Sequence, residues 1–202
     1  QIYKSYGLLS RGHVVTVDRK SLVGRYYDSE LKAVEQAVNS AQGGVLFIDE
    51  AYNLYVEDDP KDPGHKIIET LLTYLSDSNY KDWMLVLAGY PKEIDKLINS
   101  NPGLKSRIAQ RFIFDDYDVD ELMQIAELYC RDHFYIMDDQ VRTHLRSVIQ
   151  RDYSSRDDKF GNARYVISLF ENTIVPNMAR RLSSIDNPSA RQLQKIESVD
   201  IP

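Results

Sequence analysis

The chain has 202 residues, of which 43% are hydrophobic and 28% charged, and its formal net charge is −6 at pH 7. This size and composition are typical of a soluble globular protein and exclude a disordered or fibrous chain. The acidic balance argues against binding to nucleic acid or an anionic membrane, and the single cysteine, Cys130, excludes an internal disulfide. No apolar run reaches transmembrane length, and together these features favour a cytoplasmic protein.

The first half of the chain alternates strand patterns with helix patterns. Unbroken apolar or β-branched runs predict strands at residues 13–17, 45–48, 83–88 and 111–114. Apolar residues at helical spacing predict helices at 29–41, 67–75 and 91–98, with a loop at 60–64 and a turn at 101–103. Continuous apolar strands that alternate with helices indicate an α/β fold with a parallel sheet.

The pattern changes at residues 115–118, after which only helices are predicted. They cover residues 119–134, 138–152 and 162–180. The sequence therefore predicts two domains, an α/β core at 1–116 and a small helical domain at 117–202.

The segment Val45-Leu46-Phe47-Ile48-Asp49-Glu50 carries the clearest chemistry. Four apolar residues followed by two acids place both carboxylates at the carboxyl end of a buried strand, where open α/β sheets bind ligands. Asp49 could hold the magnesium of a bound nucleotide, and Glu50 could orient and polarise an attacking water. The plain alternative is a strand that ends in a polar loop.

Further blocks follow in a recognisable order: Leu87-Ala88-Gly89-Tyr90, then Asn101-Pro102-Gly103-Leu104-Lys105-Ser106-Arg107-Ile108, then Asn162-Ala163-Arg164. With the acidic strand, they resemble the AAA+ family, and within it the branch that contains the red-type rubisco activase CbbX and stage V sporulation protein K. The resemblance covers nearly the whole chain. It implies a P-loop-type sheet core with an all-α lid, bound ATP and Mg²⁺, and a hexameric ring that remodels protein substrates.

The resemblance also implies roles for single residues. Asp49 and Glu50 match the Walker B acids, and Arg107 matches the arginine finger offered to the nucleotide of a neighbouring subunit, a task that suits a permanently charged guanidinium. Arg111 is a rival for that role, and Arg107 could also be a surface arginine paired with an acid. Arg164 matches the sensor 2 arginine, or is an exposed arginine at the start of a helix.

Two further assignments are open. Tyr90 lies near the sensor 1 position, or is simply a turn tyrosine before Pro91. Tyr26 and Tyr27 match the first two places of an aromatic–hydrophobic–glycine pore loop that would grip a polypeptide substrate, but Asp28 replaces the glycine. Asp28 also suits a helix N-cap, and both tyrosines could be half-buried packing residues.

A phosphate-binding Gly-x-x-x-x-Gly-Lys-Ser/Thr motif is absent from the sequence. Because Asp49, Glu50, Arg107 and Arg164 are all present, the expectation is an N-terminally truncated ATPase that does not hydrolyse ATP as a fragment. The main alternative is a non-hydrolysing AAA+ scaffold or interaction subunit. A DNA-acting AAA+ protein is a weaker alternative, because the chain is acidic and has no basic helical stripe.

Overall fold

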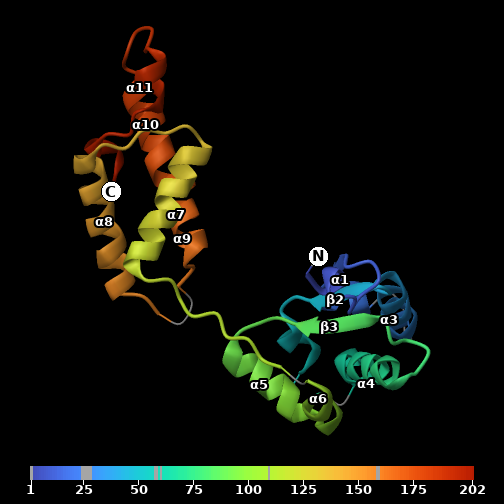
Figure 1. The fold of residues 1–202 in the computed structure, drawn as a ribbon. Coiled ribbons are helices and arrows are strands. Elements are labelled where there is room, and N and C mark those ends of the chain that lie inside the picture. The colour runs from blue at the N-terminus through green and yellow to red at the C-terminus, as the bar shows by residue number, and fades with distance from the viewer. Residues whose placement is uncertain (1, 24–28, 57–58, 60, 109, 158–159) are drawn as a thin grey trace. The chain divides into compact units, whose positions relative to one another are not determined.

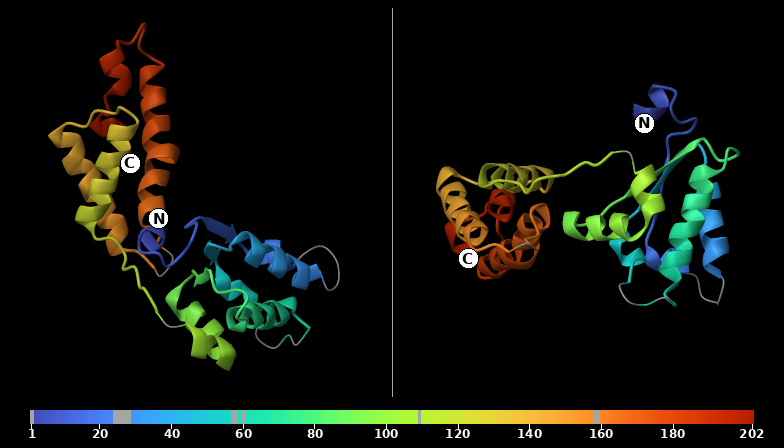
Figure 2. Two further views of the ribbon diagram at one scale, coloured as in Figure 1. Left: turned by 45° about the vertical axis from the view of Figure 1, so that its right-hand side comes forward. Right: turned by 90° about the horizontal axis from the view of Figure 1, so that it is seen from below.

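The computed structural model describes residues 2–23, 29–56, 59, 61–108, 110–157 and 160–202. The chain forms two compact units, Gln1–Ile113 and Phe114–Pro202, coloured blue to green and yellow to red in Figure 1 and seen from two other sides in Figure 2. Each unit has its own buried hydrophobic cluster. In the described part of the chain, no helix is both long and apolar enough to cross a membrane.

The first unit is built on a parallel sheet of three strands, β1 (Val14–Val17), β2 (Gly44–Ile48) and β3 (Trp83–Leu87). They lie in the order β1-β2-β3, so β2 is central, and Ile48 pairs with Val17 on one side and Leu87 on the other. Each strand connection contains a helix, as parallel pairing requires. The predicted α/β fold with a parallel sheet is confirmed.

One face of this sheet carries the core of the first unit. Leu46 and Ile48 are fully buried against two helices that lie side by side, α3 (Ser29–Ser40) and α4 (Pro63–Ser76). The apolar spacing predicted from the sequence supplies the matching helix faces. The opposite face is more open, and Val14 on it is 59% exposed.

The remaining elements of this unit are short, and most of them follow the strands. They are α1 (Ile2–Ser5), α2 (Arg19–Val23), the 3₁₀ helix η1 (Ala51–Leu54), α5 (Pro91–Ser100) and α6 (Pro102–Arg107). The turn predicted at 101–103 is in fact the start of α6. The Asn101 side chain accepts a hydrogen bond from the Gly103 N–H at 2.8 Å, and Pro102 occupies the first helical position, where a missing N–H does no harm.

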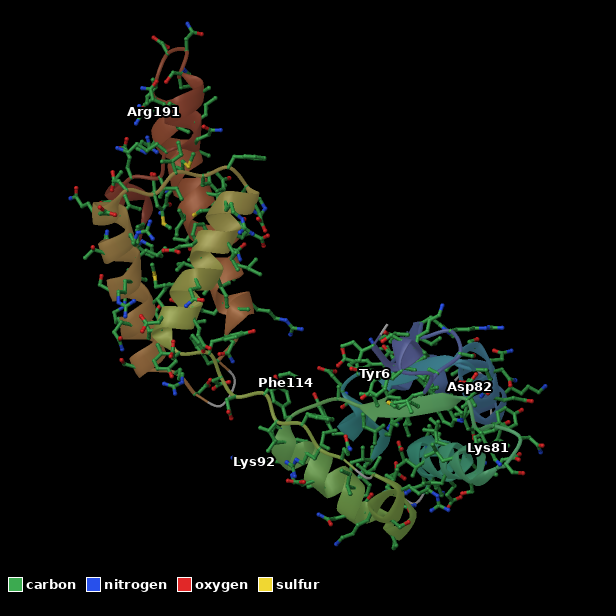
Figure 3. All side chains as sticks on the ribbon, in the orientation of Figure 1. Tyr6, Lys81, Asp82, Lys92, Phe114 and Arg191 are labelled. Atoms are coloured by element: carbon green, nitrogen blue, oxygen red, sulfur yellow. The ribbon has the colours of Figure 1, made fainter. Side chains whose placement is uncertain are left out.

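The strand predicted at 111–114 is wrong. This segment has no regular secondary structure, and Phe112, Ile113 and Phe114 are 73%, 61% and 92% exposed. Figure 3 shows Phe114 on the segment that leaves the first unit. An apolar run becomes a strand only where a neighbouring strand meets its backbone hydrogen bonds, and among the described residues the sheet ends at β1 and β3.

A partly buried ion pair joins α2 to the start of α4, and its arginine also holds η1. Asp62 caps α4 by accepting from the Gly64 N–H at 2.8 Å, and its side chain is only 7% exposed. Arg19 on α2 forms an ion pair with Asp62 and also donates to the Asn53 carbonyl of η1 at 2.5 Å. One guanidinium therefore ties together α2, η1 and the start of α4.

The second unit is a bundle of helices, as predicted. Its elements are α7 (Val119–Asp132), α8 (Asp139–Ser154), α9 (Ala163–Leu169), the π-helical segment η2 (Phe170–Ile174), α10 (Val175–Leu182), α11 (Ala190–Gln194) and the 3₁₀ turn η3 (Ser198–Asp200). The helix predicted at 162–180 is the rod from α9 through η2 to α10. Its π-helical segment ends two residues before Pro176, which has no N–H for a regular helical bond.

The two separate cores lead to a prediction about stability. Phe170 is fully buried and stacks on Tyr129 with ring centroids 4.6 Å apart. Phe170→Ala should lower the unfolding free energy of the second unit by about 3–5 kcal/mol, because it leaves a cavity. Phe134→Ala is the matched control, since Phe134 is 75% exposed, and should change it by less than about 0.5 kcal/mol.

Trp83, the single tryptophan, lies in β3 and reports on the first unit alone. In urea unfolding, Phe170→Ala should shift the loss of helical circular dichroism while leaving the Trp83 fluorescence transition in place. A fluorescence transition that moves equally far would contradict two independent cores.

The Asp62 carboxylate makes the stability of the first unit depend on pH. Burial by itself would raise the pKa of Asp62, but the hydrogen bonds from Arg19 and the Gly64 N–H, with the charge of Arg19, lower this pKa overall. The stabilisation is therefore present above the unfolded-state value of about 3.9 and is lost as the pH falls through the lower native pKa.

Arg19→Met should accordingly cost about 3 kcal/mol at pH 7, because it leaves a buried carboxylate unpaired, and much less at pH 3. Urea unfolding followed by Trp83 fluorescence at both pH values measures this. Arg111→Met breaks an exposed pair with Asp95 and should cost about 0–1 kcal/mol at pH 7. An Arg19→Met loss of equal size at both pH values would argue against the role given to the Asp62 charge.

Candidate active site

The two acids that follow β2 are fixed by the backbone of the neighbouring strands. The Asp49 N–H donates to the Val17 carbonyl at 3.0 Å, and the Ala51 N–H donates to the Ala88 carbonyl at 2.9 Å. Glu50, between them, adopts the left-handed conformation with φ 47°, which turns the chain sharply into η1. Both acids are exposed, so the turn presents two solvated carboxylates at the carboxyl end of the sheet.

The Glu50 carboxylate is held by side chains from η1. The Asn53 amide donates to Glu50 Oε2 at 3.2 Å. Burial raises the pKa of the Tyr52 hydroxyl, and the charge of Glu50 and a hydrogen bond to it raise this pKa further. Tyr52 therefore stays protonated near neutral pH and can donate to Glu50. Because Arg19 holds the Asn53 carbonyl, the position of Glu50 depends on the ion pair beneath η1.

Tyr90 joins this group from the end of β3. It stands at the N-cap position of α5 without a side-chain capping bond, it is 57% exposed, and its ring centroid lies 6.1 Å from that of Tyr52. Gly89 permits this approach, because a Cβ at that position would lie 2.6 Å from the Tyr52 ring. The structure thus gathers Asp49, Glu50 and Tyr90 at one edge of the sheet. Tyr52 and Asn53, which hold Glu50, were not predicted, although they stand only two and three residues after it.

Arg107 lies elsewhere, at the end of α6. Its guanidinium is exposed and donates to the hydroxyl oxygen of Ser76, which is the last residue of α4. The distances to Ser76 Oγ are 2.7 Å from Nη2 and 3.2 Å from Nε. The rival Arg111 is engaged differently, in a two-pronged ion pair with Asp95 at 2.5 Å and 3.2 Å. A carboxylate neutralises Arg111, whereas the partners of Arg107 among the described residues are neutral. This difference favours Arg107 as the arginine that is free to meet an anion.

Helix α4 separates Arg107 from Glu50. Its first turn is tied through Asp62 and Arg19 to η1, which holds Glu50, and its last residue, Ser76, holds Arg107. An α-helix of 14 residues is about 21 Å long. The two groups therefore belong to opposite ends of α4, and Arg107 is poorly placed to act at the Glu50 carboxylate of its own chain.

Arg164 belongs to the second unit, where it is exposed on the first turn of α9. Asn162, which precedes it, has a structural task. Its side chain accepts from the Tyr117 N–H at 3.1 Å and donates to Asp116 at 2.7 Å, while its own φ is 49°. The block Asn162-Ala163-Arg164 thus fixes the start of α9 against the segment that enters the unit, and it leaves the Arg164 side chain exposed to solvent.

The other predicted residues add no second site. Tyr26 and Tyr27 lie outside the described residues. Cys130 is buried in the second unit, and burial raises the pKa of its thiol to about 12, so it is no nucleophile near neutral pH. Within the described ranges, no group of three or more His, Cys, Asp or Glu residues could hold a metal ion. A cation at Asp49 would therefore need ligands from a bound molecule or from water.

Comparison with known proteins agrees with this architecture. Residues 3–116 match the family described as ATPases associated with various cellular activities (AAA), and residues 118–202 match the AAA lid domain. Protein CbxX (chromosomal) of Cupriavidus necator is 37% identical over 182 residues, which are 90% of this chain and 56% of that protein. Protein CbbX of Cereibacter sphaeroides is 35% identical over 196 residues, which are 96% and 62%.

Stage V sporulation protein K of Bacillus subtilis is 32% identical over 202 residues, which are all of this chain and 62% of that protein. The chain thus spans somewhat over half the length of these relatives. Among solved structures, a P216G mutant of Thermotoga maritima RuvB superposes with a TM-score of 0.59 over 94% of this chain and 52% of that one. Its 17% identity shows the fold alone. The chain belongs to the AAA family of ATPases, with an AAA domain and an AAA lid domain.

Proposed function

We propose that the protein containing this chain hydrolyses ATP as a hexameric ring and uses the energy to remodel protein substrates in the cytoplasm. The observation that carries the proposal is the separation of Glu50 from Arg107 by the length of α4, which gives each chain one half of two different sites. The chain itself has no phosphate-binding motif and spans somewhat over half the length of its relatives, so the activity is proposed for the whole protein.

Asp49 and Glu50 fit the two tasks that hydrolysis requires. Asp49 Oδ1 accepts the Glu50 N–H at 3.0 Å, and Oδ2 accepts none of the hydrogen bonds found among the described residues. One exposed carboxylate oxygen suits Mg²⁺, which keeps most of its ligands as water and phosphate oxygens. Bound ATP–Mg²⁺ supplies the phosphoanhydride bond and the charge of the metal. Glu50 orients the attacking water and accepts its proton.

Arg107 acts at the site of a neighbouring subunit. A guanidinium spans phosphate oxygens in a two-pronged manner and stabilises the charge that develops during phosphoryl transfer. The two ends of α4 then face two different neighbours in the ring, which makes hydrolysis conditional on assembly.

Arg164 and Tyr90 read the state of the nucleotide in this proposal. Arg164 would reach the phosphates from the lid, and Tyr90 stands beside Tyr52, which contacts Glu50. The substrate is a polypeptide, gripped by Tyr26 and Tyr27, in keeping with the acidic charge of the chain, which disfavours nucleic acid.

The test is steady-state ATP hydrolysis by the full-length protein and its Glu50→Gln variant. The variant should lose roughly 10²–10⁴-fold in kcat, because it removes the proton acceptor while keeping the shape of the side chain. Binding of a fluorescent ATP analogue should stay within about twofold, since an amide at that position does not disturb ground-state contacts to the phosphates.

Glu93→Gln is the matched control, because Glu93 is a partly exposed residue of α5 paired with Lys96, and it should leave kcat unchanged. If the full-length protein binds ATP but does not hydrolyse it at any protein concentration, the protein is a non-hydrolysing scaffold of the AAA family. If Glu50→Gln hydrolyses ATP at the unmodified rate, Glu50 does not activate the water.

A further inference from the structure

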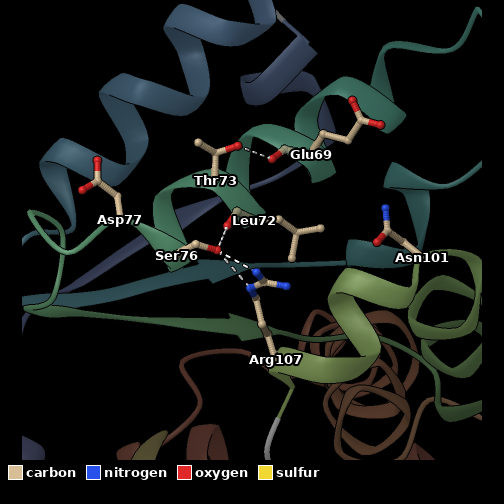
Figure 4. A pocket seen from close by; sticks show the side chains of 7 residues that line it. All are labelled: Glu69, Leu72, Thr73, Ser76, Asp77, Asn101 and Arg107. Atoms are coloured by element: carbon tan, nitrogen blue, oxygen red, sulfur yellow. Dashed lines mark hydrogen bonds between the residues drawn. The ribbon is translucent and has the colours of Figure 1, made fainter.

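The guanidinium of Arg107 is fixed by a helix that is distant from it in sequence. Ser76 Oγ, 31 residues earlier in the chain, accepts two hydrogen bonds from it, from Nη2 at 2.7 Å and from Nε at 3.2 Å. The remaining prong, Nη1, donates to the Gly103 carbonyl at 3.2 Å within α6. Figure 4 shows the side chain of Arg107 reaching from α6 to Ser76 at the end of α4. Hydrogen bonds on two edges of the guanidinium thus fix the direction of an exposed arginine side chain.

The hydroxyl of Ser76 can act only as an acceptor toward Arg107. It donates its own hydrogen to the Leu72 carbonyl one turn earlier in α4, at 2.7 Å. A hydroxyl has one hydrogen and two lone pairs, so both lone pairs are left to face Arg107. The position of Ser76 Oγ is in turn fixed by the helical backbone of α4. The guanidinium is therefore oriented by a rigid element of the fold.

Ser76, which orients Arg107, carries no charge. This matters because the arginine has to meet an anion. Arg111 shows the alternative within the same unit, because the Asp95 carboxylate neutralises it. A hydroxyl fixes the geometry of Arg107 without neutralising its charge, although Glu69 and Asp77 line the same groove. Ser76 and Arg107 also line an open groove between α4 and α6, so the held guanidinium is accessible from outside.

We infer that Ser76 is a positioning residue for Arg107: it holds the guanidinium in the direction in which the arginine meets the nucleotide of the neighbouring subunit. This inference rests on the proposed function, in which Arg107 acts at that nucleotide. A pre-oriented arginine loses less side-chain freedom when the transition state forms, so the benefit falls on kcat. Binding of ATP, which precedes that contact, does not depend on Ser76.

The test is ATP hydrolysis by the full-length protein carrying Ser76→Ala or Ser76→Thr. Ser76→Ala should lower kcat by roughly three- to tenfold, the value of a lost hydrogen bond, with KM and the binding of a fluorescent ATP analogue changed by less than about twofold. Ser76→Thr keeps the hydroxyl and should restore kcat to within about twofold of the unmodified protein. A purely structural role would instead lower the melting temperature and the nucleotide affinity together with kcat.

Thr70→Ala is the matched control. Thr70 lies on the same helix and makes the same kind of bond, from Oγ1 to the Lys66 carbonyl at 2.7 Å, away from Arg107. It should leave kcat unchanged. If Ser76→Ala and Thr70→Ala have equal effects on kcat, or if Ser76→Ala raises kcat, Ser76 does not position Arg107 for catalysis.

A double-mutant cycle with Arg107→Ala separates this inference from the proposed function. If Ser76 acts through Arg107, Ser76→Ala should have no further effect on kcat once Arg107 is alanine. If Arg107→Ala abolishes hydrolysis but Ser76→Ala alone is silent, the inference fails and the proposed function stands. If Arg107→Ala is itself without effect, the arginine finger and the role of Ser76 are both refuted.

Discussion

The position of Glu50 depends on how tightly the end of β2 is held between its two neighbours. Backbone bonds join Asp49 to Val17 on one side and Ile48 to Ala88 on the other, so the chain leaves the sheet at a fixed point. The left-handed turn at Glu50 then directs the chain into η1, and the Arg19–Asp62 pair fixes η1 to α4. A carboxylate that has to direct a water molecule requires such rigid support.

Helix α4 is the second organising element, because it links two chemically different ends. Its first turn is capped by Asp62, which Arg19 ties to η1, and its last residue carries the hydroxyl that orients Arg107. The apolar side chains of the same helix, such as Ile67 and Leu71, are buried in the core beneath the sheet. The length of the helix sets the distance between the two ends, and its packing in the core fixes its position. Two half-sites on one rigid unit favour an assembly in which neighbours complete each other.

The fold and the acidic pair were readable in the sequence because they depend on local patterns. Continuous apolar runs marked β2 and β3, and the acids at 49 and 50 follow one of them directly. The prediction at 111–114 failed because an apolar run does not state whether a strand is available beside it. The start of α6 was read as a turn because Asn101-Pro102-Gly103 fits both a turn and a helix N-terminus.

Contacts between distant segments were out of reach of the sequence alone. Ser76 stands in an ordinary helical stretch, and nothing in its neighbourhood predicts that it meets Arg107. The choice between Arg107 and Arg111 likewise depended on Asp95, whose pairing only the structure shows. Similarly, Asn162 looked like part of a nucleotide-sensing motif, but its side chain fastens Tyr117 and Asp116 within the second unit.

The central claim is that each active site is shared between two chains, and mixing two inactive variants of the full-length protein tests it most directly. Subunits with Glu50→Gln keep Arg107, and subunits with Arg107→Ala keep Glu50. In a mixed ring, an intact Glu50 meets an intact Arg107 at about a quarter of the interfaces at a one-to-one ratio. We expect each variant alone to be inactive and the mixture to hydrolyse ATP. A mixture that assembles into mixed rings but stays inactive would contradict it.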